Sequence, residues 1–371
     1  MATIIDADGH ILEPRSVWQE YTEPAYRERV VQIVRDRDGI DKLMIDREVR
    51  SDPNMAIAAA CTPGGLSDPK KARTMSWDEI TPSGYDPHAR VKDMDLEGIE
   101  VAFFYPTLWL LYGDLNDPTV AAAACRAYNN WVADFCKPYP NRFFGVAPLP
   151  LQDVDEAVKE MRRVVKDLGM RAVFIRPNPY NGRQLNDPVY DPFWREAQEL
   201  NIPVAIHGSF GTKMQTLGQE RYKDPFFFHM VCHPWEMQGA CLDIICGGVL
   251  TKFPKLKVAF LEAGVGWIGH WLDRMDGHFE KMGHYVPWLK KKPSEHFREQ
   301  CFISMDPDER TLSVAVEMDL EECVIWGSDY PHFDCTFPGV VDEVKEACVS
   351  LPERAQKKII GENAKRLYNL A

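Results

Sequence analysis

The chain has 371 residues, of which 45% are hydrophobic, and this is enough to bury a large core. Its formal net charge of −13 argues against a surface that binds nucleic acid or an anionic membrane. No window of about 18 uncharged apolar residues occurs, so no membrane span is expected. The N-terminus lacks a signal-peptide pattern, and the ten cysteines include no Cys-x-x-Cys pair. We therefore expect reduced thiols and a cytoplasmic protein.

Apolar segments that predict strands alternate with segments that predict helices along most of the chain. The eight predicted strands span residues 3–8, 99–105, 142–147, 170–176, 202–207, 256–262, 301–304 and 323–327. The predicted helices span 90–97, 117–137, 153–168, 189–200, 234–252, 265–282 and 308–318, with further helices at the C-terminus. This alternation predicts an α/β fold with a parallel sheet, and eight units favour a closed (β/α)8 TIM barrel. An open doubly wound sheet is the alternative, but no Gly-x-Gly-x-x-Gly turn follows the first strand.

Two segments interrupt the alternation. Residues 12–90, which follow the first strand, are rich in Pro, Asp, Arg and Tyr and are too long for an ordinary barrel loop. Residues 208–233 form a second irregular stretch that is rich in aromatic side chains. We therefore interpret 1–371 as one barrel domain, in which 12–90 is an insertion that covers the active-site face.

Carboxylate and imidazole side chains stand at the ends of four predicted strands. Asp8 and His10 are two residues apart in the first strand, so they point to the same face. His207, Glu262 and Asp329 each end an apolar run. The strands of a β/α barrel end at one face, where these side chains would meet. Because carboxylates and imidazoles bind divalent metals, the sequence predicts a metal site there.

Four further residues are candidates for the site. His229 and His233 are four residues apart, so they would share one face of a helix and could add metal ligands; alternatively, His233 caps a helix that begins after it. His332 follows closely on Asp329 and is predicted to lie at the active site. Arg176 ends the fourth strand, where it would bind a substrate carboxylate or form an ion pair with Glu262.

Several segments together resemble the amidohydrolase-related family of the amidohydrolase superfamily, which includes aminocarboxymuconate-semialdehyde and resorcylate-type decarboxylases. They include Asp6-x-Asp8-x-His10, Gly145-Val-Ala-Pro-Leu-Pro150 and Gly327-Ser-Asp-Tyr-Pro-His332. The resemblance covers nearly the whole chain and implies a (β/α)8 barrel with a divalent metal at its C-terminal mouth. It also implies that Asp8, His10, His207 and Asp329 are metal positions, and that Glu262 occupies the position of a ligand or a catalytic histidine. A homodimer is common in the family and is therefore possible here.

The chain departs from the family pattern at two metal positions. Asp8 replaces the first histidine of the usual His-x-His pair, and Glu262 replaces the histidine that usually ends the sixth strand. With Asp329, three carboxylates would then repel one another at one mouth. One divalent ion offsets two of these charges, whereas two ions offset all three. We therefore expect one or two ions of iron, zinc or manganese, with two favoured by the carboxylate-rich set.

Three mechanisms are compatible with this site, each acting on a small organic substrate that would be bulky and apolar. The leading interpretation is hydrolysis of an amide, ester or thioester, in which Asp329 takes the proton of a metal-activated water. The first alternative is hydroxylation by a non-heme diiron monooxygenase, which the same fold is known to have hosted. The second is non-oxidative decarboxylation of an aromatic or enolic acid, against which the replacement of histidine by Glu262 counts. A non-catalytic binding barrel is the alternative outside the enzymes.

Overall fold

Eight parallel strand positions form the centre of the protein in the computed structural model, which describes residues 3–50 and 56–371. In chain order the strands are β1 (Ile5–Ile11), β5 (Val101–Pro106), β6 (Phe143–Gly145) continued by β7 (Ala147–Pro148), β8 (Val173–Ile175), β9 (Val204–His207), β10 (Val258–Leu261), β11 (Cys301–Met305) and β12 (Val324–Trp326). Parallel hydrogen bonds join β1–β5–β6 and β7–β8–β9–β10–β11–β12. These strands confirm the eight predicted ones, with ends that shift by a few residues.

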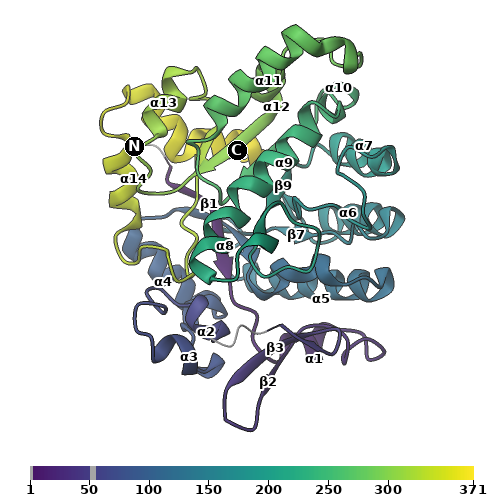
Figure 1. Ribbon diagram of the computed structural model, residues 1–371. Helices are drawn as coiled ribbons and strands as arrows, with labels where there is room; N and C mark the ends of the chain where they lie inside the picture. Colours follow the sequence, from purple (N-terminus) through teal and green to yellow (C-terminus); the bar gives the residue numbers. More distant parts are fainter. Residues whose placement is uncertain (1–2, 51–55) are drawn as a thin grey trace.

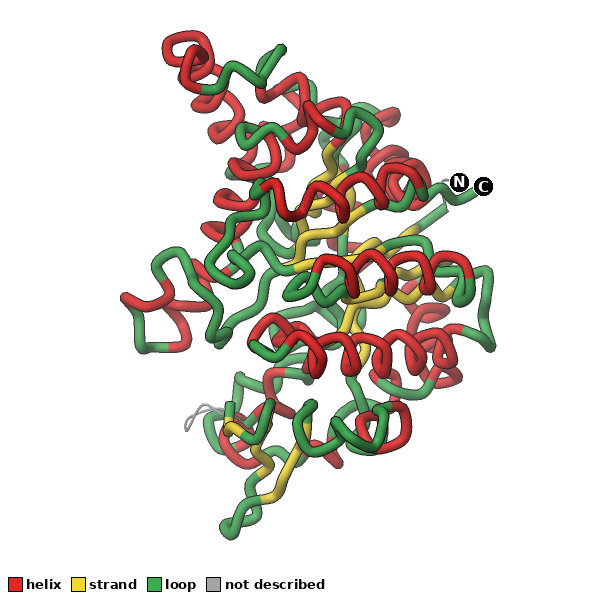
Figure 2. Tube along the Cα trace, turned by 90° about the vertical axis from the view of Figure 1, so that its right-hand side faces the viewer, coloured by secondary structure: helices red, strands yellow, loops and turns green. Residues whose placement is uncertain are grey.

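Backbone hydrogen bonds between the first and last strand regions close the barrel. The amide of Asp329 donates to the carbonyl of Asp8 at 3.0 Å, and the amide of His10 donates to the carbonyl of Tyr330 at 2.8 Å. Nearly every strand residue is buried, since helices cover the outside and side chains fill the inside. Figure 2 shows the strands running through the middle of the molecule with helices around them. The observed architecture is therefore the predicted (β/α)8 barrel.

The outer helices are arranged in chain order around the barrel (Figure 1). They are α4 (Pro87–Glu97), α5 (Pro118–Cys136), α6 (Val154–Lys166), α7 (Asp191–Glu199), α9 (Pro234–Ile245), α10 (Val249–Lys252), α11 (Ile268–Met282), α12 (Pro293–Gln300), α13 (Leu312–Glu317), α14 (Val340–Cys348), α15 (Glu353–Lys357) and α16 (Asn363–Tyr368). Aspartates cap several of these helices. Asp86 precedes α4 and Asp117 precedes α5, and each carboxylate accepts a hydrogen bond from a backbone amide in the first turn. A proline is the first residue of both helices.

Three helix predictions were wrong. The predicted helix 234–252 is two helices, because Gly248 has a φ of 85° and ends the regular helical path between α9 and α10. The stretch 208–233, predicted to be irregular, contains α8 (Pro225–Cys232), which Asp224 caps. Helix α12, just before β11, was not predicted, because a basic run and a proline suggested a loop there.

The insertion after β1 carries its own small antiparallel sheet, drawn at the lower end of Figure 1. It consists of β2 (Gln32–Arg35), β3 (Asp41–Ile45) and β4 (Glu48–Val49), with the short helices α1 (Val17–Tyr21), α2 (Ile57–Ala60) and α3 (Lys71–Thr74) nearby. Buried Asp41 accepts hydrogen bonds from Arg15, Arg35 and the amide of Trp77, so it ties β3 to three other parts of the insertion. That the insertion acts as a lid stays a prediction.

The described residues bear on two expectations from composition. All ten cysteines are free thiols, as expected. Within the described ranges, 3–50 and 56–371, no helix is both long and apolar enough to cross a membrane.

Candidate functional site

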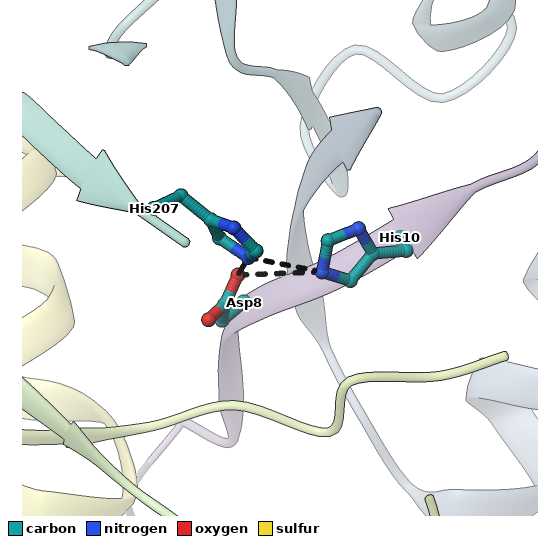
Figure 3. Close-up of side chains that lie close together, drawn as sticks. All are labelled: Asp8, His10 and His207. Atoms are coloured by element: carbon teal, nitrogen blue, oxygen red, sulfur yellow. Dashed lines mark hydrogen bonds and ion pairs between the residues drawn. The ribbon is translucent and has the colours of Figure 1, made fainter. Parts of the chain in front are cut away.

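Three ligand-type side chains converge at the carboxyl ends of β1 and β9 (Figure 3). The side chains of Asp8 and His10 project from β1, and His207 is the last residue of β9. His207 Nε2 lies 3.5 Å from Asp8 Oδ1 and 3.2 Å from His10 Nε2, and His10 Nε2 lies 3.8 Å from Asp8 Oδ1. All three side chains are buried, so the predicted convergence of these residues is observed.

Hydrogen bonds to the backbone set the protonation of both imidazoles. His10 Nδ1 donates to the carbonyl of Pro106, and His207 Nδ1 donates to the carbonyl of Gly208, each at 2.8 Å. A carbonyl only accepts, so the proton of each neutral ring is on Nδ1 and the lone pair is on Nε2. The two lone pairs face each other 3.2 Å apart, beside Asp8 Oδ1, which is buried without a hydrogen-bond partner among the described residues. This donor set fits a divalent cation, which would satisfy all three atoms.

Asp329 and His332 form a tight pair at the edge of this cluster. Asp329 Oδ1 lies 2.7 Å from His332 Nδ1 and 3.2 Å from His10 Nε2. Burial alone would raise the pKa of Asp329, but the neighbouring His332 outweighs burial and holds that pKa below its usual range. Burial likewise disfavours the charged His332 ring, yet Asp329 raises the pKa of His332 above its ordinary value. The other ring nitrogen, His332 Nε2, is 3.0 Å from the hydroxyl of Thr107.

Glu262 and His233 occupy the opposite side of the cluster. Glu262 Oε2 lies 3.2 Å from His207 Nε2 and 3.3 Å from His233 Nδ1. Burial, together with the negative charges of Asp329 and Asp8, raises the pKa of Glu262 well above its ordinary value. Burial and the neighbouring imidazoles lower the pKa of His233. Glu262 follows β10 in a left-handed conformation, with a φ of 52°, and its amide donates to Ser304 Oγ at 2.9 Å.

The other predicted site residues are placed less directly. His229 Nε2 is 3.9 Å from Asp334 Oδ2, and the ring centroids of His229 and His233 are 5.4 Å apart. Arg176 is fully buried and donates to Asn178 Oδ1 and to the carbonyl of Ser209. The structure records no ion pair between Arg176 and Glu262, both of which it describes, so that alternative was wrong. Substrate binding by Arg176 and metal binding by His229 stay predictions.

Sequence reasoning missed several residues of the site. Asp306 directly follows β11 and, with Asp334, contributes to the negative charge around Glu262. The acidic residue after an apolar run is the same signal that indicated Glu262, so Asp306 could have been found. Asp6 accepts hydrogen bonds from the amide and hydroxyl of Ser328, and it therefore fastens β1 to the loop after β12. No local pattern pointed to Thr107.

Two cavities adjoin the residues around the cluster, and both are lined by Glu262 and His233. The first, of about 340 Å³, is bordered by His229, His233, Glu262 and His332 and is otherwise mainly apolar. Its apolar lining comes from the barrel loops and from the insertion, at Leu43, Val49, Ile57, Ala60, Cys61, Leu108, Leu110, Leu111, Phe210, Phe228 and Phe333. The second, of about 360 Å³, lies on the other side of Glu262 and is lined by several carboxylates. The C-terminal mouth of the barrel thus adjoins one mainly apolar cavity and one acidic cavity.

The chain is a closed β/α barrel with buried carboxylates and imidazoles at its C-terminal mouth. These features are typical of TIM-barrel proteins that bind a metal there. A sequence model of the amidohydrolase family matches residues 5–370, and the chain belongs to this family of the amidohydrolase superfamily, whose members are enzymes. The family assignment confirms the resemblance seen in the sequence.

Characterised relatives share about a quarter of their residues with the chain. It is 26% identical to 2-amino-3-carboxymuconate-6-semialdehyde decarboxylase of Dictyostelium discoideum over 79% of each chain. It is also 26% identical to gamma-resorcylate decarboxylase of a Rhizobium species, over 76% of this chain and 86% of the relative.

Solved structures share the fold. An amidohydrolase of Mycobacterium avium subsp. paratuberculosis matches with a TM-score of 0.80 and 22% identity over 99% of both chains. A dihydroxybenzoic acid decarboxylase of a Polaromonas species, with bound manganese and the inhibitor 2-nitroresorcinol, matches with a TM-score of 0.66 and 19% identity over 100% of this chain and 98% of that chain.

Proposed function

We propose that this protein is a divalent-metal-dependent decarboxylase that releases CO2 from a small aromatic or enolic carboxylic acid. The observation that carries the proposal is the buried Asp8–His10–His207 cluster, with its free Nε2 atoms, beside a largely apolar cavity. Decarboxylases are among its relatives, and one structural neighbour holds manganese with an aromatic inhibitor. These comparisons favour our second alternative over hydrolysis, which we expected to be the reaction. None of the relatives described above is named as an oxygenase, and the metal named in one of them is manganese rather than iron.

In this proposal each group of side chains has one task. A divalent ion bound at the mouth would supply Lewis-acid chemistry that draws electron density from the substrate's carboxylate. Asp8, His10 and His207 would hold this ion, and the apolar lining of the cavity would receive the ring and exclude water.

The reaction needs one proton. When the bond between the ring carbon and the carboxylate breaks, CO2 leaves and the electron pair stays on the carbon, which must then be protonated. The Asp329–His332 pair would supply this proton, because the short Nδ1–Oδ1 contact holds one between them at the edge of the cavity. The hydroxyl of Thr107 would orient the imidazole through Nε2.

Decarboxylation in heavy water tests this function. Protein loaded with Mn²⁺ is incubated in D2O with a panel of ortho-hydroxybenzoic and enolic acids, and released CO2 and deuterium in the product are measured. We expect CO2 release with one deuterium placed at the carbon that carried the carboxylate. His332→Gln should abolish CO2 release while the protein keeps its manganese. The matched control is His278→Gln, because His278 is exposed on α11.

Two results would contradict the proposal. One is cleavage of esters, amides or lactones by the same preparation without CO2 release from any acid, which would favour hydrolysis. The other is consumption of O2 with hydroxylation of an apolar compound, which would favour the oxygenase alternative.

A further inference from the structure

The atoms that would bind a metal ion at the barrel mouth are buried, so an ion needs a route to reach them. Asp8 is 3% exposed, and His10 and His207 are 0% exposed. A divalent cation in solution is strongly hydrated, and it loses free energy when it leaves water for a passage lined by carbon atoms. A passage lined by carboxylates supplies oxygen atoms in place of that water. The two cavities beside the mouth differ in this respect.

The acidic cavity carries negative charge that no basic side chain balances. Six carboxylates line it, and no lysine or arginine of the described chain does. They belong to Glu262, Asp306, Asp308, Asp329, Asp334 and Glu343. The side chains of Asp308 and Glu343 form no ion pair with any described residue. The other cavity has a mainly apolar wall that includes Arg50 and Lys213, so it favours a cation less.

The inner end of the acidic cavity touches the metal-binding atoms. Glu262 and Asp329 line the cavity and also contact the cluster. Glu262 Oε2 lies 3.2 Å from His207 Nε2, and Asp329 Oδ1 lies 3.2 Å from His10 Nε2. Both of these imidazole nitrogens carry lone pairs, because the protons are on Nδ1. The acidic cavity therefore leads to the two nitrogens that would bind the ion.

His233 stands unpaired in the wall of this cavity. It is 5% exposed, and neither of its ring nitrogens has a hydrogen-bond partner among the described residues. Its ring is packed against the end of β9, since a Cβ atom added to Gly208 would lie 2.7 Å from His233 Nδ1. A neutral imidazole has one lone pair, which can replace a water molecule of a passing cation. A buried polar group without a partner thus lies between the carboxylates and the cluster.

We propose that the acidic cavity is the entry route of the metal ion. Its carboxylates attract a hydrated divalent cation from solution, and the ion passes Glu262 and His233 on its way to the Asp8–His10–His207 cluster. A cleft lined by charge of one sign concentrates its field and speeds the arrival of the opposite charge. The same charge repels an anionic acid, so the ion and the substrate would approach from different sides. The inference rests on the metal site of the proposed function, but it goes beyond the reaction because it concerns how fast the ion arrives.

The rate of metal uptake tests this route. Metal-free protein is mixed with Co²⁺, a coloured substitute for Mn²⁺, and the absorbance is followed by stopped flow; excess EDTA then gives the dissociation rate. The double variant Asp308→Asn/Glu343→Gln removes two charges of the cavity and leaves the cluster intact. At low ionic strength its association rate constant should fall by about 10-fold, while the dissociation rate stays within about twofold and the ions per chain are unchanged. The difference should shrink in about 1 M salt.

Two conditions make the comparison specific. The control Asp319→Asn/Asp342→Asn changes the net charge equally at two exposed positions outside the cavity, and it should follow the wild type. The measurements are made at about pH 8, because desolvation and the neighbouring carboxylates raise the pKa of Asp306 to about 7. Equal slowing in both double variants would mean that only the overall charge matters, and this would overturn the route.

Other outcomes would also overturn the route. One is an unchanged association rate in Asp308→Asn/Glu343→Gln. Another is faster uptake in Lys213→Gln, on the wall of the apolar cavity, with no effect of the double variant. If uptake were unchanged in the double variant while the protein released CO2, the route alone would fail. Slowed uptake in a protein that released CO2 from no acid would support the route and contradict the proposed function.

Discussion

The two sides of the barrel mouth differ in how their polar atoms are satisfied. On the β1 side, His10 donates to the carbonyl of Pro106, and Glu13 accepts the amides of Leu108 and Trp109. On the β10 side, Glu262 Oε2 and both ring nitrogens of His233 make no hydrogen bond to any described residue. Apart from Asp8 Oδ1, the β1 side is therefore organised by the polypeptide itself, whereas three polar atoms on the β10 side have no hydrogen-bond partner in the described chain.

This difference suggests a division of labour. A ligand set whose tautomers are fixed by backbone carbonyls loses little freedom when a metal binds, and this favours affinity. Side chains such as Glu262 and His233, whose polar atoms have no hydrogen-bond partner in the described chain, are positioned by packing alone. Changes on the β1 side should therefore affect both the fold and the affinity for a metal ion, while changes on the β10 side should affect the fold less.

The largest effect is expected from removing a ligand on the β1 side. His10→Ala deletes the nitrogen that lies near Asp8, His207 and Asp329, so affinity for Mn²⁺ should fall by more than the roughly 100-fold that outer contacts provide. Calorimetric titration of metal-free protein measures this loss. If His10→Ala bound Mn²⁺ as tightly as the wild type, the cluster would not be the metal site. His88→Ala, an exposed position on α4, is the control.

The next effect is a pH dependence of stability on the β1 side. Burial raises the pKa of Glu13 from its ordinary 4.5 to about 7, so the folded protein keeps a proton that the unfolded chain releases. The stability contributed by this proton is complete below pH 4.5 and is lost as pH rises through 7, by up to about 3 kcal/mol. Glutamine cannot titrate, so the unfolding free energy of Glu13→Gln should gain that amount relative to the wild type between pH 4.5 and 8.

Urea unfolding at several pH values measures the Glu13 effect. The change with pH is compared rather than the absolute stability, because glutamine offers the two amides one acceptor fewer. Glu20→Gln alters an exposed carboxylate on α1 and should follow the wild type throughout. Parallel curves for Glu13→Gln and the wild type would show that Glu13 loses its proton at the same pH in the folded and unfolded protein, so that burial does not raise its pKa.

A smaller effect is expected where β12 approaches β1. A Cβ atom at Gly327 would lie 2.4 Å from Asp8 Cβ and 3.0 Å from its carbonyl oxygen, so Gly327→Ala should destabilise the fold by about 1–3 kcal/mol. Because Asp8 must move, Mn²⁺ affinity should fall as well. In Gly277→Ala on α11 nothing lies near the added methyl group, and stability should rise by about 0.5–1 kcal/mol. Denaturation and titration of both variants decide whether the close contact matters.

The smallest effect concerns the contact between Thr107 and His332. Thr107→Val leaves His332 Nε2 without its partner, so the unfolding free energy should fall by about 1 kcal/mol. Chemical denaturation measures this change, and Thr74→Val, at an exposed position on α3, should stay within about 0.5 kcal/mol of the wild type. Equal stability of Thr107→Val and the wild type would mean that this contact contributes nothing.

The barrel and the first cluster could be predicted from the sequence because both follow from simple periodicities. Asp8 and His10 are two residues apart in a strand, and His207 ends another, so their convergence needs only the parallel topology. The strand ends of Glu262 and Asp329 were recognisable for the same reason. The reaction was not predictable in this way, since decarboxylation and hydrolysis use similar ligands and differ in the substrate.

Other features depended on contacts between distant segments. The role of Asp6 as a tether for Ser328 requires knowing that β1 and β12 are neighbours across the closed barrel. The missing hydrogen bonds of His233 depend on its packing against Gly208, which no spacing reveals. Helix α8 was missed because its run of three phenylalanines lacks an amphipathic pattern, although the cap at Asp224 and the proline after it were available signals.

The left-handed backbone at Glu262 and Asp329 has a consequence for how such sites diverge. Both residues have φ values near 50°, a left-handed backbone conformation that residues other than glycine, asparagine, aspartate and histidine seldom adopt. The strain is imposed by the turn after the strand and not by the residue that occupies it. A histidine and a glutamate can therefore exchange at position 262 while the main chain keeps its path. Evolution can in this way change the charge of a metal centre by one side chain and leave the scaffold intact.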